Sequence, residues 1–275
     1  MDNSSRMHIV TVMAHPDDAE VNVGGLAAIW ADAGHRVTFV TMCRGELGHH
    51  RMDAEAAIHR RQAEAEAAAR SLGAAYESLA FPECAFMPDI GNRLALIRCL
   101  RRLAPDIIIT HPMDDYHVDH RHASRLAADA LFLLQVPKVA PELPALRRMP
   151  RLFHAVHRRD YAESLPLWHA FPVDGMRERR LKALALHESQ MFEWLPWVSG
   201  WPEPPPPGQE EERLRYVEAM FEGPGRWLAD RRRAELIAGH GEAGARCECA
   251  EALYATPASG AAAPDFLRSL SPRVF

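Results

Sequence analysis

The sequence is poor in several features that mark whole classes of protein. It has five cysteines in 275 residues, an odd and scattered set that does not suit a disulfide framework. No apolar run approaches the length of a membrane-spanning helix, and the first residues, MDNSSRM, lack the apolar core of a signal peptide. We therefore expect a cytoplasmic protein with free, mostly buried thiols and no membrane partner.

Basic clusters and nucleotide-binding glycines are also missing. The formal net charge is −5 and the arginines are scattered, which argues against a nucleic-acid partner. The two short basic runs, Arg177–Arg180 and Arg231–Arg233, fall in helical patterns and suit solvated helix faces. No GxGxxG follows the first strand pattern, because Gly24-Gly25 comes too late to hold a pyrophosphate. We therefore expect no dinucleotide of the usual kind.

What is present is a regular alternation of strand and helix patterns. Continuous apolar runs such as "DIIIT" suit strands that are covered on both faces. Glycine or proline marks three helix ends, at Gly34, Gly73 and Pro105. Strands are expected at His8–Ala14, Val37–Cys43, Tyr76–Phe81 and Asp106–His111, and helices at Glu20–Ala33, Asp53–Leu72, Ile90–Leu103 and Asp119–Leu134. This rhythm predicts an α/β fold, a doubly wound and mostly parallel Rossmann-like sheet with helices on both faces.

The second half of the chain has shorter patterns. Strands are expected at Leu152–His157, Leu167–Phe171 and Glu251–Ala255, and helices near Gly175–Gln190, Gln209–Glu222 and Trp227–His240. The segment Trp201–Gly208, "WPEPPPPG", predicts a stiff extended loop between them. We expect residues 1–200 to form a catalytic α/β domain. Residues 201–275 would add the Pro-rich loop and a C-terminal helical extension packed on that domain.

The first chemical motif is "VTVMAHPDDAE", which begins at Val10. A buried strand runs directly into His15, Asp17 and Asp18, and a helix begins there. Side chains at the carboxyl end of a strand in a doubly wound sheet face the crevice where ligands bind. An aspartate at a helix N-terminus also suits a cap, which explains one of the two carboxylates but not the histidine.

The second motif, "THPMDDYHVDHRH", begins at Thr110 and again follows a strand pattern and precedes a helix. It concentrates histidines and aspartates, which are His111, Asp114, Asp115, His117, Asp119, His120 and His122. Two such clusters at strand ends can face one another across the crevice. A set of histidine, carboxylate and histidine leaves a coordination position open, as in a catalytic metal site. The spacing leaves His117 and His120 equivalent as ligands.

These residue types indicate a hydrolase. Zinc suits histidine and carboxylate ligands and lowers the pKa of its bound water toward ~7. Asp17, the carboxylate left beside the ligands, would take the proton of that water as general base, and a remaining histidine would serve as acid or oxyanion stabiliser. A 2-His-1-carboxylate iron(II) oxygenase uses the same ligands and stays open as an alternative. A non-catalytic protein with a closed, fully ligated metal is a third hypothesis.

The motifs resemble those of the LmbE-like family, also called PIG-L or GlcNAc-deacetylase-like, of zinc-dependent N-deacetylases. "AHPDDAE" and "DYHVDH" carry the resemblance most specifically. Gly24-Gly25, "TMCRGELG", "RQAEAEAAARSLG" and "KALALHESQ" follow in the same order. Val118 stands where the family usually has proline. The resemblance implies removal of an N-acyl group, first of all acetyl, from an amino sugar or related small molecule.

The same resemblance implies individual roles. One zinc ion per subunit would be held by His15, Asp18 and His120, with another divalent metal such as Fe²⁺ as the alternative. Asp17 would be the general base, His117 the acid or oxyanion stabiliser, and Asp119 would orient a histidine. A homo-oligomer is also implied, with the Pro-rich loop as a candidate contact.

Three further residues are candidates for the substrate side of the site. Arg44 and Glu46 follow the second strand, at the edge where the metal is expected, and are plausible contacts for substrate hydroxyls. Arg61 falls on the apolar face of its expected helix. It either lies along the edge of the core or points inward to pair with a ligand anion or with a carboxylate such as Glu46.

Overall fold

A computed structural model describes residues 6–156, 168–256 and 266 of the chain. Residues 157 and 167, at the ends of two expected strands, lie outside the described part. The elements are β1 His8–Met13, α1 Asp18–Asp32, β2 Arg36–Cys43, α2 Ala54–Ser71, β3 Ala75–Phe81, α3 Ile90–Leu103, β4 Ile107–Thr110, α4 Val118–Leu133, β5 Arg151–Val156, β6 Trp168–Pro172, α6 Arg177–Ala185, α7 Leu195–Ser199, α8 Glu210–Arg231, α9 Arg233–Arg246 and β7 Ala250–Ala255. A π-helical turn, Gln190–Trp194, leads into α7.

The strands form one seven-stranded sheet in the order β3-β2-β1-β4-β5-β7-β6. The first five of these are parallel, and β7 runs antiparallel between β5 and β6. The chain moves outward on one side through β2 and β3 and then returns to the other side of β1 with β4. The predicted doubly wound, mostly parallel sheet is confirmed, and its topological switch point lies between β1 and β4.

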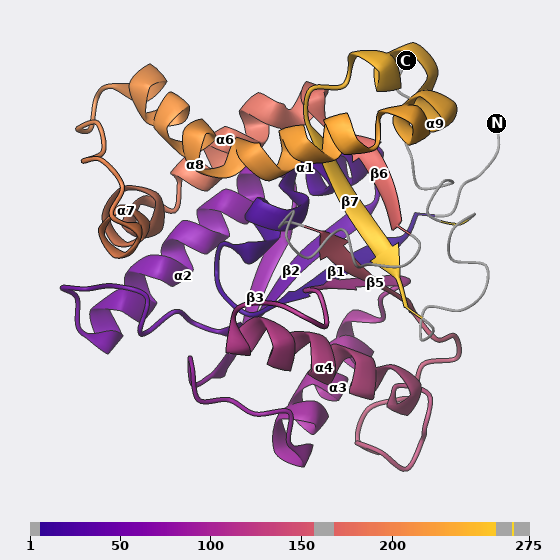
Figure 1. The fold of residues 1–275 in the computed structure, drawn as a ribbon. Coiled ribbons are helices and arrows are strands. Elements are labelled where there is room, and N and C mark those ends of the chain that lie inside the picture. Colours follow the sequence, from indigo (N-terminus) through magenta and orange to yellow (C-terminus); the bar gives the residue numbers. More distant parts are fainter. Residues whose placement is uncertain (1–5, 157–167, 257–265, 267–275) are drawn as a thin grey trace.

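Helices cover both faces of the sheet, as Figure 1 shows. Alternate residues of β1 enter opposite cores, with Ile9 and Met13 on the side of α1 and Val10 and Val12 on the side of α3 and α4. These strands are buried on both faces, which explains why their sequences read as continuous apolar runs. No helix in the described part combines the length and apolarity needed to span a bilayer.

The C-terminal segment departs from the expected helix pattern. In place of helices near Gln209–Glu222 and Trp227–His240, one helix, α8, continues through Pro224, and α9 follows it. Proline inside a helix loses a backbone hydrogen bond and costs about 3 kcal/mol. The helix persists because it buries Val217 on one side of the proline and Leu228 on the other.

Candidate metal centre and pocket

The two polar motifs meet at one edge of the sheet. Strands β1 and β4 are hydrogen-bonded neighbours, with Val12 opposite Thr110. His15 follows β1, and His120 lies in the first turns of α4, after the loop that leaves β4. The switch point between these strands brings together side chains more than 100 positions apart in the sequence.

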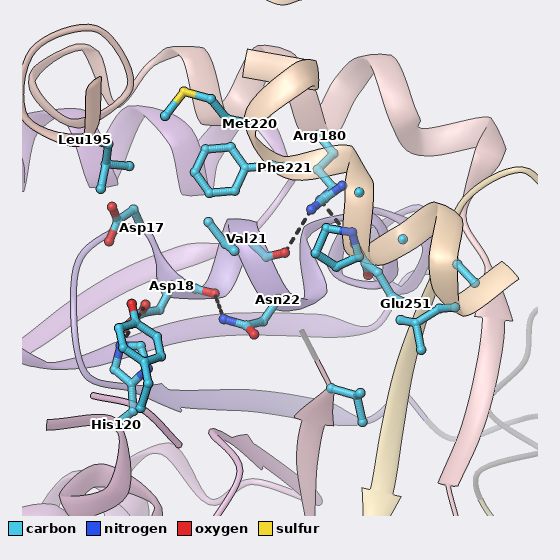
Figure 2. Close-up of a pocket in the computed structure, with 17 residues that line it drawn as sticks. Asp17, Asp18, Val21, Asn22, His120, Arg180, Leu195, Met220, Phe221 and Glu251 are labelled. Carbon is cyan, nitrogen blue, oxygen red and sulfur yellow. Dashed lines mark hydrogen bonds and ion pairs between the residues drawn. The ribbon is translucent and has the colours of Figure 1, made fainter. Parts of the chain in front are cut away.

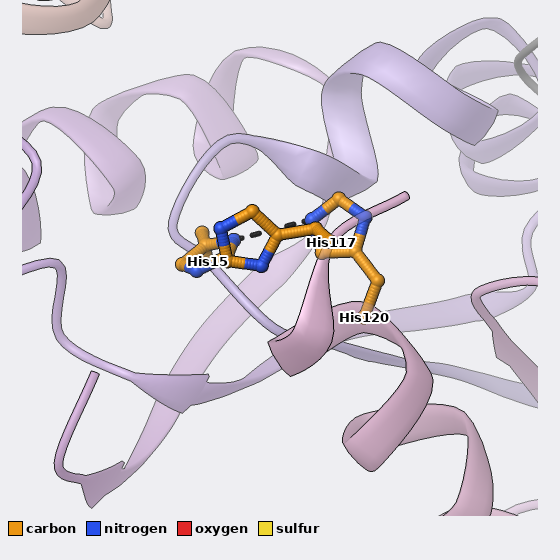
Figure 3. A group of neighbouring side chains, drawn as sticks. All are labelled: His15, His117 and His120. Atoms are coloured by element: carbon orange, nitrogen blue, oxygen red, sulfur yellow. Dashed lines mark hydrogen bonds between the residues drawn. The ribbon is translucent and has the colours of Figure 1, made fainter. Parts of the chain in front are cut away.

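His15, Asp18 and His120 converge on one point. His15 Nδ1 lies 3.3 Å from Asp18 Oδ2, His120 Nε2 lies 3.3 Å from Asp18 Oδ1, and the two ring nitrogens are 3.3 Å apart. Figure 3 shows the two rings approaching each other, with His117 beside them. Ligand atoms at about 2.0–2.1 Å from a tetrahedral zinc ion lie ~3.3 Å from one another. The three donors therefore fit a small divalent cation.

Carboxylates orient both histidine rings of this cluster. Asp119 Oδ2 lies 3.3 Å from His15 Nε2, and Asp115 Oδ1 lies 3.2 Å from His120 Nδ1. Both carboxylates are at least 98 % buried, so water does not compete for their contacts with the histidine rings. A histidine ligand whose second nitrogen meets a carboxylate is held in one orientation and is a more basic ligand. Asp115 was part of the histidine-rich motif, but no orienting role was assigned to it from the sequence.

The electrostatics of the cluster favour positive charge. Burial opposes protonation of His15, but hydrogen bonds to Asp119 and Asp18 outweigh it and raise its pKa to about 10. Burial likewise opposes protonation of His120, and the charge of Asp18 outweighs it, raising the pKa to about 9. The pKa of Asp18 is well below its ordinary value, because the charge of His120 outweighs the effect of its burial. A point that stabilises a proton so strongly also suits a metal cation.

Besides the three histidines described in the next paragraph, neighbouring donors form two groups with members of this cluster, Asp18–His111–His120 and His15–Cys43–Asp119. His111 Nε2 already accepts a hydrogen bond from Ala14 N at 3.0 Å, and its lone pair is occupied. The thiol of Cys43 donates to Ala14 O, and burial raises its pKa, so it stays neutral. Both groups are therefore poorer cation sites than the one above.

His117 occupies a different position from His120. It is the N-cap of α4, and its Nδ1 accepts a hydrogen bond from Asp119 N at 3.2 Å. Its ring centroid lies 4.7 Å from that of His15 and 4.9 Å from that of His120, and the three rings also form a potential ligand group. Burial, and then the charges of His15 and His120, lower the pKa of His117. His117 is therefore a neutral imidazole beside the cluster.

Arg61 points inward and is 2 % exposed. Its Nη2 lies 3.4 Å from Asp17 Oδ1 and its Nη1 3.8 Å from Glu83 Oε1, so its partners are these carboxylates rather than Glu46. Gly45, with φ +82°, leaves room for the guanidinium, since a Cβ there would lie 2.4 Å from Nη1. The glycine-rich turn after β2 and the arginine of α2 thus fit each other.

The other predicted substrate contacts, Arg44 and Glu46, are not among the residues that line the pocket described below. Arg44 is exposed, and Glu46 Oε1 accepts a hydrogen bond from Glu83 N at 2.7 Å. Glu83 was not singled out from the sequence. It also lies 3.6 Å from His15 Nε2, which places it beneath the cluster. No local motif marks Glu83, because the turn after β3 that carries it has no pattern of its own.

A cavity of about 490 Å³ opens beside the cluster. Asp17, Asp18 and His120 line one end of it, and Arg180 and Glu251 line the other, as Figure 2 shows. The remaining wall is largely apolar and comes to a large extent from α8. The sequence offered no sign of this contribution, because α8 lies more than 80 residues beyond the histidine motif.

Comparisons with known proteins agree with this architecture. Residues 10–131 match the family model described as PIG-L: GlcNAc-PI de-N-acetylase. The chain is 26 % identical to 4-oxalmesaconate hydratase of Pseudomonas putida over 172 residues, 60 % of this chain and 67 % of the relative. It is 26 % identical to diacetylchitobiose deacetylase of Thermococcus kodakarensis over 204 residues, 69 % of this chain and 73 % of the relative.

A solved structure shares the fold across nearly the whole chain. N,N'-diacetylchitobiose deacetylase from Pyrococcus horikoshii aligns with a TM-score of 0.69 at 19 % identity, covering 93 % of this chain and 86 % of that one. Fold and site together define an α/β enzyme with histidine and aspartate side chains clustered at the mouth of a pocket. The match of residues 10–131 to the PIG-L family model confirms the resemblance to the PIG-L or LmbE-like family. The two chitobiose deacetylases among these proteins are amide hydrolases.

Proposed function

We propose that the protein is a zinc-dependent hydrolase that removes an N-acyl group, first of all acetyl, from an amino sugar or a related small molecule. The observation that carries the proposal is the spacing of His15 Nδ1, Asp18 and His120 Nε2, each pair 3.3 Å apart, at one end of a cavity of about 490 Å³. A cavity of this size accepts a small molecule beside the cation.

The metal belongs to the proposal. Zinc bound by His15, Asp18 and His120 would polarise the amide carbonyl and lower the pKa of a coordinated water toward ~7. Fe²⁺ uses the same ligand types and is the alternative occupant. Because Asp18 and His120 both line the cavity, the arrangement favours an open site over a closed structural one.

Asp17 is the proposed general base. It lines the cavity next to Asp18, and its Oδ1 lies 3.4 Å from Arg61 Nη2. That contact holds the carboxylate in place while leaving its second oxygen for a proton from water. His117, neutral by virtue of its lowered pKa, would donate a hydrogen bond to the developing oxyanion, and the proton that Asp17 takes from the water would pass to the leaving amine. Asp119 would orient His15.

A hydratase is the second candidate, because one relative that matches over 67 % of its own length is named as one. Hydration also needs a water molecule and a positioned base, so the same residues suit either reaction. The iron(II) oxygenase remains an alternative for the metal site. The cytoplasmic location and the homo-oligomer remain predictions.

The test combines metal analysis with a screen for products. The purified protein, supplied with zinc, would be incubated with N-acetylated amino sugars while free amine is measured, and with unsaturated carboxylic acids while their absorbance is followed. Amine release that depends on zinc supports the proposal. Loss of absorbance from an unsaturated acid without any amine release would favour the hydratase. Oxygen consumption that depends on iron would favour the oxygenase.

A further inference from the structure

His111 is a buried histidine that the proposed reaction does not use. It follows β4 directly, has no exposed surface, and is not among the residues that line the cavity beside the cluster. A substrate in that cavity therefore does not touch it. Its ring nevertheless contacts each of the segments that carry the proposed metal ligands, so its contacts bear on the geometry of the metal centre.

The first contact reaches the main chain beside His15. His111 Nε2 accepts a hydrogen bond from Ala14 N at 3.0 Å. Ala14 immediately precedes His15, so this bond holds the backbone at the point where the ligand side chain leaves it. A backbone N–H only donates, so Nε2 carries the lone pair and the ring proton is on Nδ1. Asp18 Oδ2 lies 3.2 Å from the same nitrogen and accepts its own hydrogen bond from His15 N at 2.7 Å.

The second contact is with the ring of His120. The two imidazoles are nearly parallel, with centroids 3.9 Å apart and an angle of 9° between their planes. Two rings packed at this distance cannot tilt independently, because tilting either one would bring its atoms into the other. Asp115 Oδ1, 3.2 Å from His120 Nδ1, fixes where that nitrogen points. The stack with His111 adds a second constraint, since it fixes the plane of the His120 ring.

His111 is itself held in place by two other elements. Its carbonyl oxygen accepts hydrogen bonds from Ser124 Oγ on α4 at 2.8 Å and from His154 Nδ1 on β5 at 2.7 Å. Its main chain is thus fixed by a helix and a strand, and its ring by Ala14. A side chain orients a metal ligand only if its own position is fixed by packing and hydrogen bonds, and His111 meets this condition.

We propose that His111 is a positioning residue of the metal centre. It holds the plane of the His120 ring and the main chain beside His15, so that the three donors stand at cation spacing before a cation binds. The inference rests on the proposed function for the presence of the metal. It goes beyond the ligand set, because the metal affinity then depends on a histidine that does not bond the ion.

Three substitutions separate the two contacts. His111→Ala removes both of them. His111→Phe keeps a flat ring against His120 but offers no acceptor to Ala14 N, and His111→Gln keeps an acceptor of similar reach without a ring. Zinc affinity would be measured by competition with a chromophoric chelator. His111→Ala should bind zinc about 10–100-fold more weakly than the unmodified protein, and the other two variants should each recover part of that loss.

Cobalt would report the ligand geometry directly. The visible absorption of bound Co²⁺ depends on the number and arrangement of its ligands. We expect the spectrum of cobalt-loaded His111→Ala to differ from that of the unmodified protein, because the ring of His120 is free to tilt. A substitution that only lowers stability leaves the spectrum of the folded, cobalt-loaded protein unchanged. The spectrum therefore separates positioning of the ligands from general support of the fold.

His8→Ala is the matched control. His8 is a buried histidine at the opposite end of β1, where its Nδ1 lies 2.8 Å from Leu103 O and its Nε2 2.9 Å from Thr38 Oγ1. Its replacement should lower the unfolding free energy and leave the zinc affinity and the cobalt spectrum unchanged. If His111→Ala does not fold, His111→Phe and His111→Gln carry the test, and each should bind zinc more weakly than the unmodified protein.

The possible outcomes separate this inference from the proposed function. Unchanged zinc affinity and an unchanged cobalt spectrum in the His111 variants would refute the positioning role alone, as would an equal loss of affinity in His8→Ala. An unmodified protein that binds neither zinc nor cobalt would refute the proposed function and the inference with it. Zinc held tightly by the unmodified protein and weakly by His111→Ala, without amine release from any N-acetylated compound, would support the inference and refute the proposed deacetylation.

Discussion

Asp119 Oδ2 lies 3.3 Å from His15 Nε2 and at the same time accepts a hydrogen bond from Cys84 N at 2.8 Å. This double contact ties the loop after β1 to the start of α4 and the turn after β3. Because Nε2 of His15 is engaged by the carboxylate, Nδ1 is the nitrogen presented to Asp18 and His120. The geometry of the proposed metal centre therefore depends on a residue outside the ligand set.

We expect Asp119→Ala to weaken metal binding by about 10–100-fold, since an unsupported histidine is a less basic and less oriented ligand. Zinc affinity would be measured by competition with a chromophoric chelator. Asp129→Ala, at a partly buried position of the same helix where the carboxylate pairs with Arg93 and Arg125, is the control and should bind zinc as the unmodified protein does. Equal affinities for the two variants would contradict the orienting role.

The ligand set leads to a second prediction. His15→Ala, Asp18→Ala and His120→Ala should each lose most of the bound zinc, because two protein ligands remain. His117→Ala should keep its zinc and lose activity. The ring of His122 contacts Phe86 O and not the cluster, so His122→Ala should keep both zinc and activity. Metal content would be measured by atomic absorption. A fully occupied His120→Ala together with an empty His117→Ala would reverse their roles.

Replacing Asp17 tests the proposed base. Asp17→Asn should retain zinc and bind substrate with similar affinity, while the turnover number falls by about 10²–10⁴-fold because no carboxylate takes the proton. Steady-state kinetics on the substrate found by the screen would give the two parameters separately. Asp114→Asn, an exposed change in the histidine-rich loop, should behave as the unmodified protein. A near-normal turnover number in Asp17→Asn would show that another group is the base.

The burial of His154 should make the unfolding free energy of the protein depend on pH. The residue is fully buried, and burial lowers its pKa from 6.5 to about 4. Unfolding therefore takes up a proton between pH 6.5 and 4, and falling pH favours the unfolded chain across this window. Relative to His154→Gln, the unmodified protein should lose on the order of 3 kcal/mol of unfolding free energy as the pH falls through that window.

Urea denaturation at several pH values would measure that difference. His59→Gln, a change at an exposed position on α2, should leave the pH dependence unaltered. Parallel stability curves for the unmodified protein and His154→Gln would contradict the assignment.

The buried contacts of Glu251 join the C-terminal strand β7 to α1 and α6. Glu251→Ala should reduce the unfolding free energy by about 3 kcal/mol or more, because it leaves Arg180 buried without this partner and the amides of Gly25 and Leu26 unsatisfied. Glu248→Ala, at an exposed neighbouring position, is the control and should change it little. Equal midpoints of urea unfolding for Glu251→Ala and the unmodified protein would contradict this prediction and would mean that water replaces the lost carboxylate.

Much of the fold was predictable from local pattern. The strand β1 and the helix α3 lie within one residue of their expected bounds, because apolar periodicity and terminal glycine or proline act over a few residues. The continuation of α8 through Pro224 to Arg231 was not predictable, since the burial of Val217 and Leu228 depends on partners far along the chain.

The sequence by itself determined that a histidine and two aspartates follow β1 and that a second cluster follows β4. The order of a parallel sheet then requires the two to meet. Only the tertiary structure decided which nitrogen of His15 faces Asp18, that Arg61 pairs with Asp17 and Glu83, and that α8 forms the wall of the pocket. Those relationships join residues separated by tens to hundreds of positions, and no local propensity acts over that distance.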